Sequence, residues 1–340
     1  MAPKLFITGG TGYIGGSVLD TIAKAHPDYE ITALLRNEPQ AFKSTYPKVK
    51  VVKGDYGSAE ILSSEAAKAD VVVHNGDSDH EPSLKAIIDG LLKRSNPGFL
   101  IHLSGTGIVS DYKDETYLGK QNPKVWSDVN DHGEIVSLPD EAPHRNTEKI
   151  LNDTVAQHND KINIAIMCPP DIYGKGRGLT KTWSAFVPIL VKQAKELGGR
   201  VFYYGEGKNT RSWVHIDDLM ALYLKLVEAA ASGGDKAEWG KNGYYFASTQ
   251  EHDQLSVITV AARVLQKAGV IETEEPIKVS LSQLDTMFVT DKYPGLSRYL
   301  FASNSRTVPD RARKLFGYEG KAPGLLDTLE QDILDALKRA

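Results

Sequence analysis

A glycine-rich turn near the start of the chain constrains the fold more than any other feature. It reads Thr8-Gly9-Gly10-Thr11-Gly12-Tyr13-Ile14-Gly15 and joins an apolar run, residues 4–8, to residues 17–24, where apolar side chains repeat with helical spacing. In such a turn Gly9 permits the tight bend, Gly12 lets the backbone approach a pyrophosphate, and Gly15 lets the helix pack closely on the strand. The helix N-terminus then offers free N–H groups to phosphates. The segment predicts a dinucleotide-binding unit, with a purely structural glycine turn as the alternative.

The rest of the first half repeats this alternation of strand and helix. Nearly continuous apolar runs of this kind are typical of strands covered on both faces, so the fold class predicted is α/β, a doubly wound parallel sheet of the Rossmann type. Strands are predicted at 30–35, 49–53, 69–74, 99–103 and 163–167, with helices from about 59, at 84–94 and at 147–158.

The pattern changes after Pro169-Pro170, where longer helices predominate. We expect a smaller C-terminal substrate-binding domain, interleaved with the sheet rather than separated by a linker. The Rossmann domain is predicted over 1–174 and completed by about 211–248, with the smaller domain over about 175–210 and 249–340. Helices are predicted there at 180–197, 217–231 and 254–268, strands at 200–204 and 243–247, an extended stretch at 277–279, and two final helices.

Charge and composition exclude several classes of protein. The net charge of −4 provides no overall positive field for nucleic acid or anionic lipid. The only cysteine, Cys168, cannot form an intrachain disulfide. Runs of about 18 apolar residues and a secretory leader pattern are both missing from the sequence. We expect a cytoplasmic protein with a small-molecule substrate, and neither nucleic acid nor membrane as a partner.

The glycine turn resembles the cofactor signature of the extended short-chain dehydrogenase/reductases, which include sugar-nucleotide epimerases, dehydratases and dihydroflavonol-reductase-like enzymes. Residues 169–174, Pro-Pro-Asp-Ile-Tyr-Gly, resemble the family segment that lies along the nicotinamide, and 211–219 resemble its later strand-turn-helix signature. The resemblance implies a possible homodimer through the helices at 84–94 and 147–158. It also implies cofactor contacts from Thr8, Gly9, Thr11, Gly12, Tyr13, Ile14, Gly15, Asp55, Tyr56, Pro169 and Ile172.

The residue that ends the second strand indicates which nucleotide is bound. An acid there accepts hydrogen bonds from a free ribose hydroxyl, whereas an arginine pairs with a 2′-phosphate. Arg36 stands at this point, about 21 residues after Gly15, and Asn37 follows it. The sequence therefore favours NADP over NAD, and an arginine that merely stacks on adenine is the alternative.

The catalytic pattern of the family is incomplete in this chain. Family members transfer hydride with a Ser or Thr, a Tyr, and a Lys four residues after the Tyr. Thr106 matches the hydroxyl residue, with Ser104 as the nearby alternative, and Lys149 matches the lysine that also holds the nicotinamide ribose. Arg145 stands where the Tyr belongs, and a guanidinium stays protonated and cannot transfer a proton.

Three interpretations of this gap are open. His144 replaces the phenol, since the pKa of imidazole suits neutral pH. Alternatively a tyrosine enters from a loop, with Tyr112, Tyr117 and Tyr173 as candidates. In the third interpretation no hydride is transferred.

Other polar residues have predicted roles around the substrate. Substrate contacts are expected from Arg145, Arg211 and Tyr173, and residues 111–143 are either a substrate lid or surface. Asp77, Asp79 and His80 are expected to cap a helix or line the cleft, and no metal site is expected.

The leading hypothesis is an NADP-dependent, carbonyl-reductase-like oxidoreductase. A non-catalytic NADP-binding redox sensor and a sugar-nucleotide epimerase or dehydratase are the alternatives.

Overall fold

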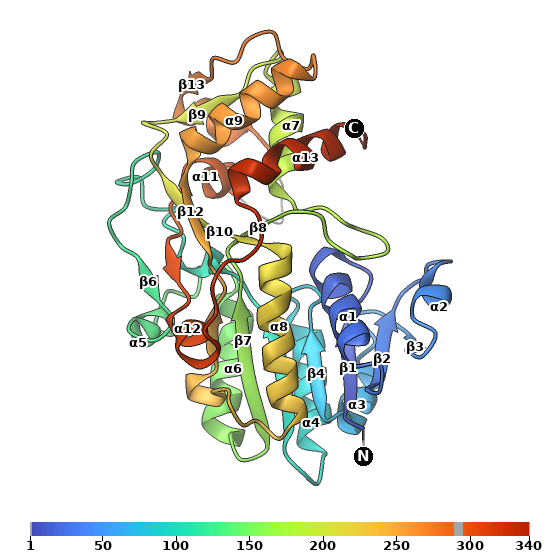
Figure 1. The fold of residues 1–340 in the computed structure, drawn as a ribbon. Helices are drawn as coiled ribbons and strands as arrows, with labels where there is room; N and C mark the ends of the chain where they lie inside the picture. Colours follow the sequence, from blue (N-terminus) through green and yellow to red (C-terminus); the bar gives the residue numbers. More distant parts are fainter. Residues whose placement is uncertain (1, 289–294, 340) are drawn as a thin grey trace.

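A seven-stranded parallel sheet forms the centre of the computed structural model, which describes residues 2–288 and 295–339 (Figure 1). The strand order is β11-β7-β5-β4-β1-β2-β3, and each neighbouring pair runs parallel. The chain therefore builds outward from β1 in one direction and then continues from β4 in the other, as the sequence predicts for a doubly wound sheet. The strands are β1 (Lys4–Thr8), β2 (Glu30–Leu35), β3 (Lys50–Lys53), β4 (Val71–His74), β5 (Gly98–Leu103), β7 (Ile162–Cys168) and β11 (Tyr244–Phe246).

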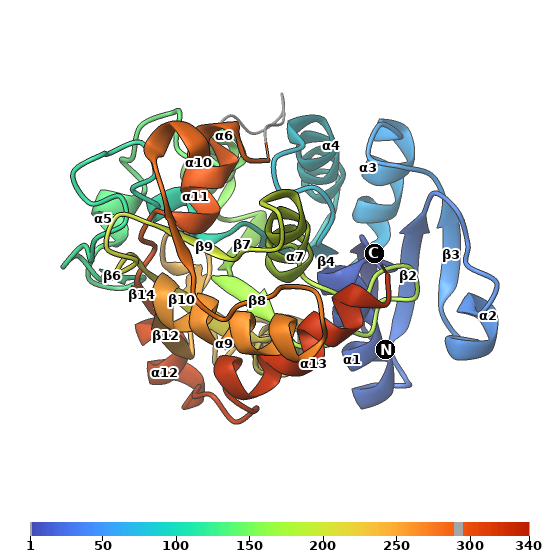
Figure 2. The same cartoon turned by 90° about the horizontal axis from the view of Figure 1, so that it is seen from above.

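Helices cover both faces of this sheet (Figure 2). One face packs against α1 (Tyr13–Ala25) and α8 (Ile216–Ala231), and the other against α3 (Ala59–Lys68), α4 (Glu81–Leu92) and α6 (Arg145–His158). Every residue of β4 and β5 is buried. This explains why these strands are continuous apolar runs in the sequence rather than alternating ones.

A smaller C-terminal part has an apolar core of its own above the sheet (Figure 1). Its main helices are α7 (Phe186–Glu196), α9 (Gln254–Lys267), α10 (Leu281–Thr286), α11 (Leu296–Phe301) and α13 (Leu325–Leu337). A small sheet of β8 (Asp171–Tyr173), β10 (Thr210–His215) and β12 (Gln250–Asp253) joins it to the rest. Within the C-terminal part, β9 (Phe202–Tyr204) pairs with β13 (Ile277–Val279).

The helix expected at 180–197 begins later than predicted. The amide and the hydroxyl of Thr180 both donate to the carbonyl of Thr11, at 3.0 and 2.7 Å. These bonds hold residues 180–185 as a loop beside the glycine turn, and α7 starts only at Phe186. Tertiary hydrogen bonds have overridden a helical pattern here, and this places the loop next to the candidate site.

Residues 111–143 are fastened to the C-terminal part of the chain. They contain β6 (Trp126–Ser127), which pairs with β14 (Thr307–Val308), and the short helix α5 (His132–Ile135). The fully buried carboxylate of Asp128 accepts hydrogen bonds from the amides of Phe246 and of Arg311 at the start of α12 (Asp310–Phe316). Such buried anchors are characteristic of a fixed structural segment.

Two surface properties bear on possible partners. Within the described ranges, no helix is both long and apolar enough to cross a membrane. On the outer surface of α4, Lys85 pairs with Glu81 and Lys93 with Asp89. A homodimer through α4 and α6 stays a prediction.

Candidate functional site

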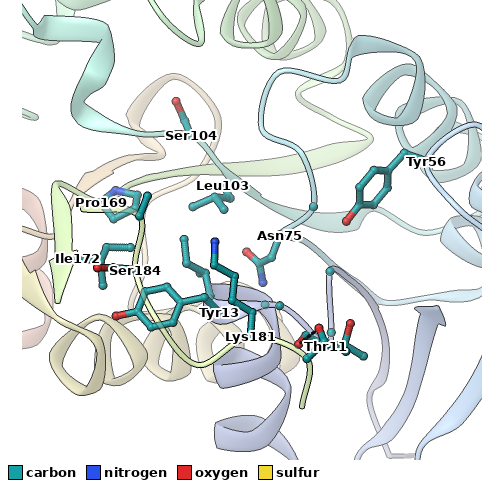
Figure 3. A pocket seen from close by; sticks show the side chains of 18 of the residues that line it. Thr11, Tyr13, Tyr56, Asn75, Leu103, Ser104, Pro169, Ile172, Lys181 and Ser184 are labelled. Atoms are coloured by element: carbon teal, nitrogen blue, oxygen red, sulfur yellow. Dashed lines mark hydrogen bonds between the residues drawn. The ribbon is translucent and has the colours of Figure 1, made fainter. Parts of the chain in front are cut away.

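A cavity of about 840 Å³ lies where the carboxyl ends of the central strands meet the C-terminal part (Figure 3). Its wall comes from the residues that follow β1, β2, β3, β4, β5 and β7, together with parts of 180–189 and of α11. The strand order reverses between β1 and β4, and ligands of open α/β sheets bind at such a point.

The glycine turn is shaped for a phosphate. Gly9 has φ +72°, and a Cβ there would collide with the carbonyl of Asn75, while a Cβ at Gly15 would collide with the carbonyl of Gly9. At Gly12 a Cβ would meet only the Gly9 carbonyl, at 3.5 Å. No side chain caps the N-terminus of α1 and its first turn contains no acid. Its N–H groups and positive dipole end are therefore available to an anion.

The side chain of Asn75 presents an unpaired hydrogen-bond donor in the cavity wall. Its Oδ1 accepts from the hydroxyl of Tyr223 at 2.8 Å, whereas its buried Nδ2 has no partner among the residues described. The side chain points into the cavity in Figure 3. A buried amide donor is costly to leave unpaired, so a bound ligand would satisfy it. Together with the glycine turn, this residue fits a dinucleotide.

The end of the cavity beside β2 and β3 contains Arg36, Asp55 and Tyr56. Arg36 is exposed and makes no hydrogen bond or ion pair within the described part of the chain. Asp55 Oδ1 instead accepts from the amide of Gly57 at 2.9 Å and from the hydroxyl of Ser58 at 3.0 Å. Burial raises the pKa of Tyr56, which therefore stays a neutral phenol.

His144 projects into the opposite end of the cavity. It precedes α6 with φ +65°, a left-handed conformation that is uncommon for a side chain larger than glycine. Its Nδ1 lies 2.7 Å from Asp79 Oδ1, and its Nε2 faces Gly105 and Gly107, where a Cβ would stand 3.0 and 3.3 Å away. Burial lowers the pKa of His144, but the hydrogen bond and charge of Asp79 outweigh it and raise the pKa overall.

Tyr299 of α11 reaches the same place from the C-terminal part. Its hydroxyl would stand 3.1 Å from a Cβ on Gly107, so this phenol and the His144 imidazole border one small space. The Arg211 guanidinium lies 4.4 Å from the centre of the Tyr299 ring, and the rings of Tyr112 and Tyr299 pack edge-on with their centres 6.0 Å apart. Tyr112 thus supports the phenol rather than replacing it, while Tyr117 does not line the cavity.

Two of the expected catalytic residues are elsewhere. Lys149 is exposed and its Nζ bonds Asp140 at 2.7 Å, so in this structure it does not line the cavity. Thr106 is buried in a 3-10 turn, where its Oγ1 accepts from Ser305 Oγ at 3.2 Å. Ser104, the alternative, does line the cavity.

The helical register of α6 explains the position of Lys149. His144 and the fully buried Glu148, four residues apart, face the sheet, and Lys149 is rotated about 100° away. Glu148 Oε1 accepts hydrogen bonds from Ser104 Oγ at 2.5 Å and from the Tyr244 hydroxyl at 3.1 Å. Burial raises the pKa of Glu148 despite these bonds. A buried carboxyl therefore stands where the family pattern led us to expect a lysine.

The three expected substrate contacts, Arg145, Arg211 and Tyr173, do not line the cavity. Arg145 is buried and donates to the carbonyls of Leu138 and Val136. Arg211 is 2% exposed and its Nε bonds Asp171 at 2.5 Å, so it reaches the cavity only through its partners Asp171 and Tyr299. Two of the expected contacts are turned inward: the Tyr173 hydroxyl donates to Pro323 O, and Thr8 Oγ1 bonds His74.

The remaining expected cofactor residues all lie along the cavity: Gly9, Thr11, Gly12, Tyr13, Ile14, Gly15, Arg36, Asp55, Tyr56, Pro169 and Ile172. Residues 111–143 are fully described and do not contribute to its wall. In the loop that follows β4, Asp79 forms a hydrogen bond with His144. His80 caps α4 by accepting a hydrogen bond from the Ser83 amide. Across the described residues, no group of three or more His, Cys, Asp or Glu side chains could hold a metal ion.

Sequence reasoning missed several residues of the site. Asn75 directly follows a predicted strand, so its position at the strand end was a usable signal. Tyr299 and Lys181 had no such signal, because they reach the cavity from the smaller C-terminal part and a loop read as helix.

Comparisons with known proteins point in the same direction. Residues 9–138 match a family described as NAD(P)H-binding, and residues 144–239 match the NAD dependent epimerase/dehydratase family. The chain is 29% identical to "Oxidase ucsJ" of Acremonium sp, over 97% of this chain and 96% of that protein. It is 23% identical to a dTDP-glucose 4,6-dehydratase of Mycobacterium tuberculosis, over 78% of each chain.

Solved structures share the fold at low identity. The DesIV dTDP-glucose 4,6-dehydratase of Streptomyces venezuelae, with NAD and TYD bound, has a TM-score of 0.64 and 18% identity over 99% of this chain and 97% of that one. The UDP-glucuronic acid 4-epimerase of Bacillus cereus, in complex with UDP-glucuronic acid and NAD, has a TM-score of 0.64 and 16% identity over 99% and 100%.

The reversed strand order, the glycine turn and the cavity define a Rossmann-type NAD(P)-binding protein with a smaller C-terminal part. Both family matches and the fold narrow this class further. Together with the fold, the two family matches support membership of the extended short-chain dehydrogenase/reductases and a chemistry among their nucleotide-dependent oxidoreductases, dehydratases and epimerases.

Proposed function

We propose that this protein is an NADP-dependent oxidoreductase that reduces a carbonyl group of a small molecule. The observation that carries the proposal is the pairing of His144 with Asp79 at the cavity wall, because it supplies a proton donor where the family tyrosine is missing. When bound, the nicotinamide cofactor supplies a hydride to the carbonyl carbon. The protein must then deliver one proton to the carbonyl oxygen.

The His144 side chain has the features of that proton donor. Asp79 holds Nδ1, which fixes the ring and leaves Nε2 facing the space beside Gly105 and Gly107, while His144 itself lines the cavity. The raised pKa of His144 favours imidazolium, the form that can release a proton to a developing alkoxide. Tyr299, whose hydroxyl borders the same space, would hydrogen-bond the carbonyl oxygen and orient it.

Arg36 supports NADP as the cofactor. It is exposed at the cavity, has no ion-pair partner within the described ranges, and follows β2, where a 2′-phosphate would lie. Asp55, the nearest candidate acid, is already engaged by Gly57 and Ser58. Replacing Arg36 by Ala should weaken NADPH binding about tenfold or more and leave NADH binding nearly unchanged.

The test is NADPH oxidation against a panel of aldehydes, ketones and nucleotide sugars. His144→Asn should lower kcat/KM by at least about 100-fold, the usual contribution of a general acid, with unchanged NADPH affinity. Lys149→Ala is the matched control on the same helix and should leave kcat/KM unchanged. Asp79→Asn should move the alkaline limb of the pH–rate profile to lower pH, because it removes the charge that raises the pKa of His144.

Each alternative predicts a different outcome. Full activity of His144→Asn would reject the proposed acid. Turnover confined to nucleotide sugars, without net NADPH oxidation, would favour an epimerase or dehydratase. Tight NADPH binding without turnover across the panel would favour a redox sensor.

A further inference from the structure

A loop from the C-terminal part of the chain lies directly on the glycine turn. The amide and hydroxyl of Thr180 both donate to the carbonyl of Thr11. Gly178 packs so closely that a Cβ on it would collide with the carbonyl of Gly12. The loop, residues 174–185, is therefore built against the phosphate-binding backbone.

A second set of contacts fixes the same loop to the helices beneath it. The Arg177 amide donates to Ser17 Oγ at 2.9 Å, and its guanidinium bonds Thr21 Oγ1 at 2.9 Å. The guanidinium also pairs with Asp20 at 3.1 Å and with Asp217. Because two carboxylates and a hydroxyl hold its guanidinium, Arg177 serves to anchor the loop and is not available to a ligand.

Unlike Arg177, Lys181 has no partner for its charge among the described residues. Its side chain lines the cavity and extends into it beside Tyr13 and Asn75 (Figure 3). It is exposed and, within the described part of the chain, has no hydrogen bond or ion pair. A loop that bonds the glycine turn through Thr180 thus brings an uncompensated lysine side chain into the cavity.

We propose that Lys181 binds the diphosphate of the dinucleotide, together with the N–H groups at the start of α1. This inference rests on the cofactor binding proposed above and assigns the diphosphate to a loop outside the glycine turn. The Thr180–Thr11 hydrogen bonds place Lys181 over the turn, whereas Arg36 follows β2 at the cavity's other wall. A lysine acts as a point charge, so it suits a diphosphate with several anionic oxygens.

Calorimetric titrations with NADPH, NADH and ADP-ribose test this assignment. Lys181→Ala should weaken all three about tenfold, because all three contain the diphosphate. The ratio of NADPH to NADH affinity should not change, in contrast to Arg36→Ala. Lys181→Arg, which keeps the charge, should stay within about threefold of the wild type. Lys175→Ala is the matched control, because this exposed lysine of the same loop does not line the cavity.

The outcomes separate this inference from the proposed function. If Lys181→Ala binds all three ligands like the wild type, the inference is wrong although the cofactor proposal stands. If it weakens NADPH and NADH but not ADP-ribose, the lysine acts at the nicotinamide end and the diphosphate assignment is wrong. If the wild type binds none of the three, both proposals fall.

Amine acetylation followed by mass spectrometry gives a second readout on the unmutated protein. ADP-ribose should slow the labelling of Lys181 several-fold and leave that of Lys175 unchanged. Equal labelling of Lys181 with and without ADP-ribose would overturn the assignment.

Discussion

Replacing Glu148 tests the helical register that distinguishes this site from the family pattern. In the native protein Glu148 is fully buried and its Oε1 accepts hydrogen bonds from Ser104, Tyr244 and, at 3.6 Å, the thiol of Cys168. Glu148→Ala removes the acceptor and leaves two hydroxyl donors buried without partners. Each such donor costs about 1–3 kcal/mol, so we expect the free energy of unfolding to fall by about 3 kcal/mol.

Two further variants make the test specific. Glu148→Gln keeps a carbonyl oxygen as acceptor and should lower the free energy of unfolding by less than about 1 kcal/mol. Lys149→Ala should leave it unchanged, because Lys149 and Asp140 form an exposed pair.

Urea denaturation, followed by tryptophan fluorescence and far-ultraviolet circular dichroism, measures these differences. The reasoning is refuted if Glu148→Ala costs less than about 1 kcal/mol, or if Lys149→Ala costs as much as Glu148→Ala. Either result would mean that the lysine rather than the glutamate faces the sheet.

Two further predictions follow from the same site. Because burial raises the pKa of Glu148, its neutral form contributes stability that is complete below the ordinary carboxyl pKa of 4.5 and is lost as pH rises through the folded value. The melting temperature of the wild type should therefore decline more steeply above pH 4.5 than that of Glu148→Gln, and parallel curves would contradict this. Tyr299→Phe should lower kcat about 10- to 100-fold without changing NADPH affinity, as expected for a group that orients the carbonyl. Stopped-flow kinetics measure kcat and calorimetry measures NADPH affinity. An unchanged kcat would exclude Tyr299 from the site.

Local patterns predicted the sheet well because each strand and each crossover helix has its own signal. Continuous apolar runs predicted β1, β2, β4, β5 and β7, since strands buried on both faces need no polar side. Helix starts were less accurate. The prediction for α4 began at residue 84, whereas a histidine cap and a proline in the first turn start it at Glu81.

The residues at the His144 end of the cavity were harder to predict, because a shift of one residue along α6 changes which side chains face inward. Matching Lys149 to the family lysine placed an arginine where the tyrosine belongs. The left-handed backbone at His144 starts α6 so that His144 and Glu148 face inward instead. A backbone angle of this kind depends on its surroundings, and no spacing rule along the chain reveals it.

The sequence by itself determined that the chain forms a nucleotide-binding sheet, because a glycine turn between strand and helix acts through its own backbone. The tertiary structure decided what faces the other end of the ligand cavity. Asp79 holds His144 at the cavity wall, whereas Tyr299 and Lys181 reach the cavity from the C-terminal part and from a loop that bonds the glycine turn. Their roles depend on the distances and charges created by that packing, and these long-range relations are invisible in any single stretch of sequence.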